Sequence, residues 1–231
     1  PLNKAAGQPL PVRFEMQPLA ANNALDEITL QLGNVATARY EQRSGAGGIE
    51  VLRGGIGVRQ PVPQPTEGVQ ANLALDQLDI DAWRHVFAAP TPDKSAAQIA
   101  AEHAAVAASA PKTSTSHNAY LPSRLSGRAQ TLRILGRDFN AVRIDATRDG
   151  ANWQSTIESR EIAGAARWHA ESAAVPFGEL TMRLSRMSIP DAQEETALTE
   201  SLARSSQEMP SLDLVADKFD LRGKALGKLE I

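Results

Sequence analysis

The sequence predicts a mainly β protein with an antiparallel sheet and one or two short helices. First, apolar and polar residues alternate along most of the 231-residue chain, which is the period-two pattern of strands with one buried face. Second, clusters of glycine, proline and aspartate separate the alternating runs, as turns do. Third, 42% of the residues are hydrophobic, which is enough to build a core.

Each alternating run places apolar side chains on one face and polar side chains on the other. The apolar members, in chain order, are Ile28, Leu30, Leu32, Val69, Ala71, Leu73, Leu75, Val142, Ile144, Ala146, Leu180, Met182 and Leu184. The segments "LDLVADKFDL" and "LGKLEI" close the series with the same alternation. We therefore expect a sheet with one apolar face.

The stretch "DGANWQSTIESREIAGAARWH", residues 149–169, holds two of the three tryptophans. Asp149-Gly150 between two alternating runs predicts a hairpin, and a second turn is expected near Arg160-Glu161. The faces that result are Trp153, Ser155 and Ile157 on the first strand, and Ile162, Gly164, Ala166 and Trp168 on the next. The glycine in the second set is expected to let the sheet bend or bulge.

Three segments interrupt the alternation. Residues 81–89 predict a short helix with Asp81 as its N-cap. Residues 91–118 form an alanine-rich insertion or linker, and residues 190–210 form an exposed helix or linker. The chain begins without methionine and stops within a strand-like pattern. We therefore expect residues 1–231 to be a fragment of one long repeating β domain.

Several classes of function lack support in the sequence. The chain has no cysteine, which excludes disulfides, thiolate catalysis and the usual structural zinc sites. The four histidines are not at metal-ligand spacing; they are His85, His103, His117 and His169. The glycine-rich "SGAGGIEVLRGGIG" lacks the Lys-Ser/Thr ending of a phosphate loop and predicts a hairpin. The net charge is −3, and the sequence shows no basic face that would indicate nucleic-acid binding. It also has no apolar run of about 18 residues that would indicate a membrane span.

These observations lead us to expect no catalytic residues, no metal, no cofactor and no enzyme activity. The apolar face then has two interpretations. It is either the core of a closed β-sandwich, serving as a structural or protein-interaction module, or an open surface that shelters lipid. Arg186 falls on the apolar parity of its strand, which a β-bulge or the end of the strand explains. The alternative explanation is an anionic partner of this arginine.

The last third of the chain resembles a known family. The segments "DGANWQSTIESREIAGAARWH", "FGELTMRLSRMSIP" and "MPSLDLVADKFDLRGKALGKLEI" are similar in order and spacing to those of the YhdP family of AsmA-like envelope proteins. Two mild departures from the family pattern are Ser155, where alanine is usual, and Met187, where leucine is usual. The segment "LALDQLDIDAWRHVF" also resembles a strand-to-helix element of that family.

The resemblance implies an extended, curved antiparallel sheet that forms an apolar groove. It implies a fragment of a protein anchored in the inner membrane and crossing the periplasm, with an architecture like that of bridge-like lipid transfer proteins. The function implied is conduction of phospholipid, or another acyl-chain lipid, between inner and outer membranes in outer-membrane biogenesis. The membranes would be contacted by parts of the protein outside this fragment, and no nucleic acid is implied. The expected groove lining is Ile28, Leu30, Leu73, Leu75, Val142, Ile144, Trp153, Ile157, Trp168, Leu180, Met182, Leu184, Leu212, Leu214 and Leu229.

Overall fold

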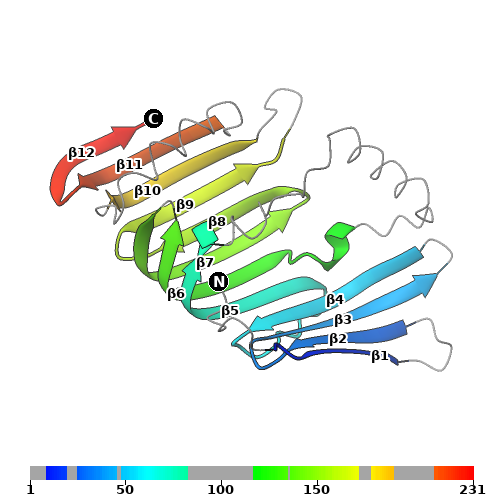
Figure 1. The fold of residues 1–231 in the computed structure, drawn as a ribbon. Helices are drawn as coiled ribbons and strands as arrows, with labels where there is room; N and C mark the ends of the chain where they lie inside the picture. Colours follow the sequence, from blue (N-terminus) through cyan, green and yellow to red (C-terminus); the bar gives the residue numbers. More distant parts are fainter. Residues whose placement is uncertain are drawn as a thin grey trace, which may run out of the picture.

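The computed structural model describes residues 9–19, 25–45, 48–82, 117–134, 136–171, 178–189 and 211–231. These residues form one twelve-stranded sheet in which the strands lie side by side in chain order, from β1 to β12 (Figure 1). The first and last strands lie at opposite edges and do not pair with each other, so the sheet is open. The predicted mainly β, extended and curved sheet is therefore confirmed.

The strands and the single 3₁₀ turn that the described residues contain have the following bounds. They are β1 (Val12–Pro18), β2 (Leu25–Leu32), β3 (Ala36–Gly45), β4 (Gly48–Val58), β5 (Gly68–Asp79), η1 (His117–Tyr120), β6 (Arg124–Ile134), β7 (Arg137–Asp149), β8 (Asn152–Glu158), β9 (Ile162–His169), β10 (Glu179–Ile189), β11 (Ser211–Leu221) and β12 (Lys224–Glu230). Both turns predicted within residues 149–169 are present, because β7, β8 and β9 form consecutive antiparallel hairpins.

The sheet is mixed rather than wholly antiparallel. β4 pairs in parallel with β5, β5 with β6, and β10 with β11. Parallel neighbours need a crossover connection instead of a tight turn. In each parallel pair, a long break in the alternation separates the two strands along the chain. These breaks hold the crossover connections, which a prediction based on tight turns between successive strands does not include.

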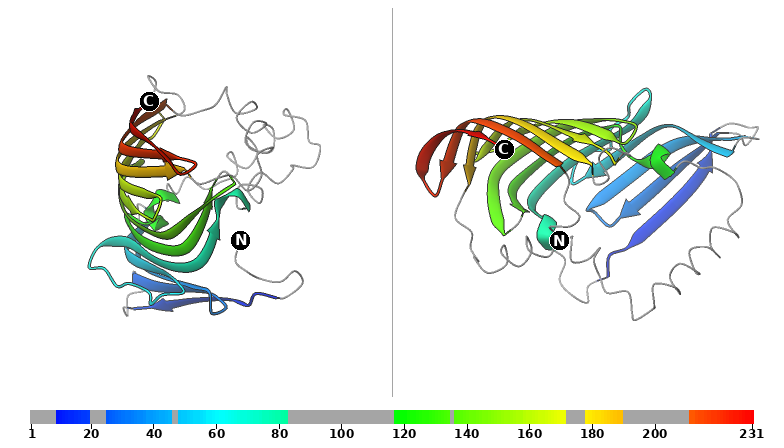
Figure 2. Two further views of the ribbon diagram at one scale, coloured as in Figure 1. Left: turned by 90° about the vertical axis from the view of Figure 1, so that its left-hand side faces the viewer. Right: turned by 90° about the horizontal axis from the view of Figure 1, so that it is seen from above.

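The sheet curves strongly, and its two faces differ in chemistry. Figure 2 shows the strands wrapping around a concave side, with η1 inside the curve and the segment of residues 59–67 outside it. The Tyr120 hydroxyl in η1 hydrogen-bonds Gln42, on the same face as Tyr40 and the apolar residues of β3. The concave side is therefore the apolar face, called here the inner face, and the polar side is the outer face.

A line of interrupted pairing crosses the middle of the sheet. The pairing of β5 with β6 and of β6 with β7 skips Asp76, Gln130 and Ala141 and resumes one residue later. Ala141 has φ of 55°, a left-handed conformation uncommon for any residue but glycine. Beyond this line the apolar positions shift by one, to residues such as Leu132 and Phe139. We call it the kink line, and it lets each strand bend while its apolar side chains keep one face.

The kink line continues into β10 as a β-bulge. The pairing with β9 shifts between Leu184 and Arg186, which leaves Ser185 as the extra residue. Arg186 consequently pairs with Ala163 on the outer face, and Met187 returns to the inner face, where it packs against Leu184. This confirms the bulge expected from the position of the arginine.

Gly164 lies directly opposite this bulge, as the sequence predicted. Its φ is 155°, and a Cβ there would lie 2.3 Å from the Arg183 carbonyl oxygen and 2.6 Å from Leu184 Cα. No real Cβ approaches backbone so closely, so only glycine lets β9 and β10 come together at the bulge.

The glycines at the end of "SGAGGIEVLRGGIG" allow the backbone of a connecting segment to lie close to β4. β3 and β4 do form the predicted hairpin, turning between Gly45 and Gly48. A Cβ on Gly55 would lie 1.9 Å from the Pro63 carbonyl oxygen, and one on Gly57 would lie 2.4 Å from that of Gln60. These glycines let the 59–67 crossover pack onto the outer face of β4.

The helix expected at residues 81–89 begins at residue 80, and its continuation beyond Ala82 lies outside the described residues. Asp81 is not its N-cap. The Asp79 carboxylate accepts the hydrogen bond from the Ala82 backbone N–H at 2.8 Å, with N-cap to N3 spacing. The Asp81 carboxylate instead accepts from Gly136 N at 2.8 Å and so ties the helix start to the β6–β7 turn.

The other two interrupting segments fall almost wholly outside the described residues. Of the 91–118 insertion, only residues 117 and 118 are described, in η1, and the 190–210 linker is not described. Within the described ranges, no helix is long and apolar enough to cross a membrane.

Candidate functional site: the inner face of the sheet

The strand register places all fifteen predicted lining residues on the inner face. Residues paired across neighbouring strands project to the same side of a sheet, so each row of paired residues can be followed from strand to strand. Trp153 pairs with Trp168, which pairs with Leu180, which in turn pairs with Leu212. A second row runs through Ile144, Ile157, Gly164, Leu184, Ala216 and Leu229. Ile28 and Leu229 lie near opposite edges, so the apolar surface extends across the whole sheet.

The register adds several residues to this face beyond the fifteen predicted from the alternation. They are Val12, Phe14 and Met16 on β1, Leu125 on β6, and Met187 and Phe219 beyond the bulge. The alternation "VRFEM" signals the first three. The last two were missed because strict counting by two fails where a strand gains an extra residue.

The inner face is covered unevenly. Leu184, Leu214 and Ala216 are the buried centre of a cluster on β10 and β11, packed against neighbours that include Ile162, Met182, Met187 and Leu229. At the β1 edge, Val12, Phe14 and Met16 are 65%, 60% and 52% exposed. No side chain larger than alanine in the described ranges is less than 2% exposed. This is the burial of a single layer, in which inner side chains are screened mainly by their neighbours in the sheet.

One part of the inner face carries a polar arrangement. The Tyr40 hydroxyl donates to the Tyr120 carbonyl oxygen at 3.2 Å, and the Tyr120 hydroxyl donates to Gln42 Oε1 at 2.8 Å. The two rings meet edge to face with centroids 5.3 Å apart. Burial raises the pKa of Tyr40, and the neighbouring Tyr120 adds to the rise. The two hydrogen bonds and the ring contact fix η1 over β3 and β4. This end of the inner face is therefore covered by the chain itself.

Arg148 is a basic residue of the inner-face parity near the end of β7. Its guanidinium lies 5.9 Å from the Trp153 ring centroid and donates to the carbonyl oxygens of Leu121 and Pro122 at 3.1 Å and 3.0 Å. Cation–π contact and carbonyl hydrogen bonds satisfy a charge beside an apolar surface. Trp153 is the second residue of β8, so this contact lies at the rim of the face, beside the turn that joins β7 to β8.

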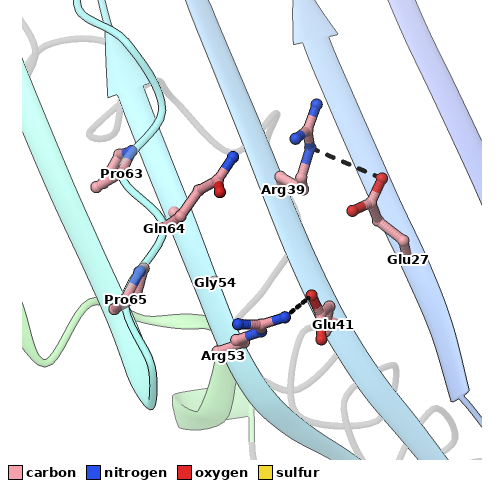
Figure 3. Close-up of a pocket in the computed structure, with 9 residues that line it drawn as sticks. Glu27, Arg39, Glu41, Arg53, Gly54, Pro63, Gln64 and Pro65 are labelled. Carbon is pink, nitrogen blue, oxygen red and sulfur yellow. Dashed lines mark hydrogen bonds and ion pairs between the residues drawn. The ribbon is translucent and has the colours of Figure 1, made fainter. Parts of the chain in front are cut away.

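The outer face is polar and is braced by ion pairs. Near the 59–67 crossover, Arg39 Nε lies 3.7 Å from Glu27 Oε1 and Arg53 Nη2 lies 2.5 Å from Glu41 Oε1 (Figure 3). These four side chains, with Gly54, Gly55, Pro63, Gln64 and Pro65, line a small hollow. Its charges are paired across neighbouring strands, and its four charged side chains are partly exposed. This is the arrangement of a cross-strand brace.

The described ranges also offer no metal-binding group of side chains. These ranges hold no set of three or more histidine, cysteine, aspartate or glutamate residues placed to bind a metal ion. The distinctive physical property of this part of the chain is instead an apolar surface shared by twelve neighbouring strands.

Comparison with known proteins decides the family. The family model described as "YhdP protein" matches residues 1–231, the whole chain. The chain belongs to the YhdP family. The resemblance noted in residues 73–87 and 149–231 therefore extends over the rest of the chain, including strands β1 to β4. No curated protein and no solved structure matches the chain.

Proposed function

We propose that the chain is a segment of an envelope-spanning protein that conducts phospholipid along the apolar inner face of its sheet. In this proposal the sheet forms a groove across the periplasm, in a protein anchored in the inner membrane, and lipid moves between the inner and outer membranes. The observation that carries the proposal is the predominantly apolar inner face that runs from β1 to β12. Membership of the YhdP family supports it.

The dimensions of the face suit acyl chains. A seven-residue strand is roughly 23 Å long at about 3.3 Å per residue, and half the hydrocarbon core of a bilayer is about 15 Å thick. The strands from β3 to β7 each have at least ten residues. On β5 to β7, beyond the part that η1 covers, an acyl chain lying across the inner face therefore finds apolar side chains on neighbouring strands.

The energetics explain why a continuous surface matters more than any single residue. Exposing one methylene to water costs about 0.8 kcal/mol, so a two-chain lipid with about 30 such groups faces roughly 24 kcal/mol if released bare. One binding residue cannot offset a cost of that size, whereas a lining that follows the lipid along its route can. Such a lining needs only apolar alternation, which accounts for the lack of a catalytic grouping among the described residues.

The closed β-sandwich interpretation does not describe this part of the chain. The described residues form a single sheet without a second one packed against it. A structural role remains the second candidate function, because an open sheet can also act as a spacer.

The experiment compares charged substitutions on the two faces in lipid transport by the full-length protein. Leu75→Glu and Ile144→Glu place a charge on the inner face, whereas Thr147→Glu places one on the exposed outer face of the same strand as Ile144. We expect the inner-face variants to block lipid passage and Thr147→Glu to retain it. Thermal unfolding of each variant separates loss of transport from loss of fold, because a buried charge also destabilises a protein. Equal effects of folded variants from both faces would refute the groove.

A further inference from the structure

Among the described residues, three arginines in the middle of the outer face differ from arginines nearer the edges in having no ion pair. Towards both edges, arginines form ion pairs such as Arg43 with Glu50 at 3.5 Å and Arg183 with Asp213 at 2.6 Å. Arg128, Arg143 and Arg160, in the middle of the sheet, have neither an ion pair nor a side-chain hydrogen bond involving their guanidinium groups. The middle of the outer face is therefore locally cationic although the chain has a net charge of −3.

Two of these arginines oppose each other directly. Arg128 on β6 and Arg143 on β7 are cross-strand partners, and both are exposed. Like charges in directly opposed positions of a sheet are destabilising. Arg143 also has Glu158 as its cross-strand partner on β8, but no ion pair joins their side chains. One carboxylate beside two guanidinium groups leaves a net positive charge, which an anion bound between the arginines would neutralise.

The pair belongs to a larger open hollow of about 1220 Å³ along the kink line. Its cationic wall consists of Arg59, Arg128, Arg143, Arg160 and Arg186, and its acidic residues are Asp76 and Glu158. Asp76 is already paired with Arg59 at 2.6 Å. The bulge in β10 is what brings Arg186 into this hollow, since regular alternation would have put it on the inner face.

The arrangement of the arginines indicates the shape of the ligand. They follow the kink line from strand to strand instead of converging on one point, and the distance from β6 to β10 is about 19 Å at about 4.8 Å per strand. A single phosphate reaches only neighbouring guanidinium groups. An extended peptide of about six residues, at roughly 3.3 Å each, spans the whole row. The two carboxylates in the wall disfavour a dense polyanion and are compatible with a peptide of mixed composition.

We infer that the hollow along the kink line binds an extended acidic segment of a partner protein. Carboxylates of the segment would pair with Arg128, Arg143 and Arg160, three arginines of this hollow whose guanidinium groups have no ion pair within the part of the chain that the structure describes. Because these side chains are exposed, the interaction is steered by charge and weakens as salt screens it. The inference concerns the outer face and holds whether or not the inner face conducts lipid.

The test measures binding of a fluorescein-labelled decapeptide of alternating glutamate and serine to the 231-residue chain by fluorescence anisotropy. The key variant is the double substitution Arg128→Gln and Arg143→Gln. Its matched control is Arg13→Gln and Arg43→Gln, which changes the net charge equally but lies near the β1 edge. We expect at least a tenfold weaker affinity for the key variant and less than a twofold change for the control. A higher melting temperature for the key variant is also expected, because the opposed charges are removed.

Three outcomes would overturn the inference. One is an absence of binding by the unaltered chain at low ionic strength. Another is an equal loss of affinity in the two double variants, which would reflect net charge alone. The third is complete displacement of the peptide by millimolar inorganic phosphate with matching affinity for the anion, which would show a single-anion site. A lysine-serine peptide of the same length is the control for non-specific adsorption.

Discussion

The same alternation of residues has different consequences at the β10–β11 pair and at the β1 edge. On β10 and β11, Leu184 and Leu214 are 3% and 4% exposed, whereas on β1 Phe14 is 60% exposed. All three lie on the inner face. The difference arises because a central strand has neighbours on both sides and an edge strand has one. In a single-layer sheet, stability is therefore concentrated in the interior strands, and the edge keeps its apolar side chains available for contact.

Truncating the most buried position should have the largest effect. Leu184→Ala removes a side chain at the centre of the β10–β11 cluster, so we expect a loss of about 3 kcal/mol in the free energy of unfolding, within the range for buried leucines. Urea unfolding followed by circular dichroism measures it. A loss below about 1 kcal/mol would show that the cluster does not hold these strands together.

Adding a methyl group at the bulge should come next. Gly164→Ala introduces a Cβ that meets the Arg183 carbonyl oxygen, so we expect a loss of about 2 kcal/mol in the free energy of unfolding. Gly45→Ala is the matched control, because nothing lies within 4 Å of its added Cβ. Its effect should stay within about 0.5 kcal/mol. Similar effects of the two substitutions would contradict the close approach of β9 and β10.

Truncation at the edge should have a smaller effect on stability and a measurable effect on lipid contact. Phe14→Ala removes a side chain that is 60% exposed, so we expect a loss of less than about 1 kcal/mol. If the edge belongs to the groove, the variant should also retain less of an environment-sensitive apolar dye. Unchanged dye binding, alongside reduced binding by Leu30→Ala on the neighbouring strand, would exclude β1 from the lipid-binding surface.

The smallest expected effect concerns a surface ion pair and pH. The Arg133 guanidinium hydrogen-bonds Asp138 and lowers the pKa of that carboxyl below its ordinary value of 3.8. A depressed folded-state pKa contributes stability above the unfolded value and loses it as pH falls through the folded value. Asp138→Asn should therefore cost less than about 1 kcal/mol at pH 7, and the difference from the unaltered chain should shrink as the pH falls below the ordinary carboxyl value of 3.8 and be smaller at pH 2. A difference that is undiminished at pH 2 in urea unfolding would assign the effect to another cause.

The inner face was predictable because period-two alternation fixes which side chains share a face. Trp153 and Trp168, placed on one face by counting, are cross-strand partners in the sheet. Leu180 and Leu212 extend the same row although they lie on parallel strands. The Asp149-Gly150 turn was also predictable from local chemistry.

Features that depend on contacts distant in sequence were not predictable in the same way. The parallel pairing of β5 with β6 joins strands separated by a long insertion, and no local signal specifies it. The capping role of Asp79 in place of Asp81 depends on where β5 ends. The kink line has a signal in hindsight, since the apolar positions shift by one in several strands at once. Recognising that signal requires knowing which strands are neighbours.

The central claim is that the inner face, and not the outer face, meets acyl chains, and lipid-depth fluorescence quenching tests it most directly. Because the chain contains no cysteine, Ile144→Cys and Thr147→Cys each provide one labelling site on opposite faces of β7. Each variant is labelled with bimane and mixed with phospholipid that carries a nitroxide on its acyl chain. The groove predicts several-fold stronger quenching at position 144 than at position 147. Equal quenching at both positions, or none at position 144 in a folded chain that retains lipid, would contradict it.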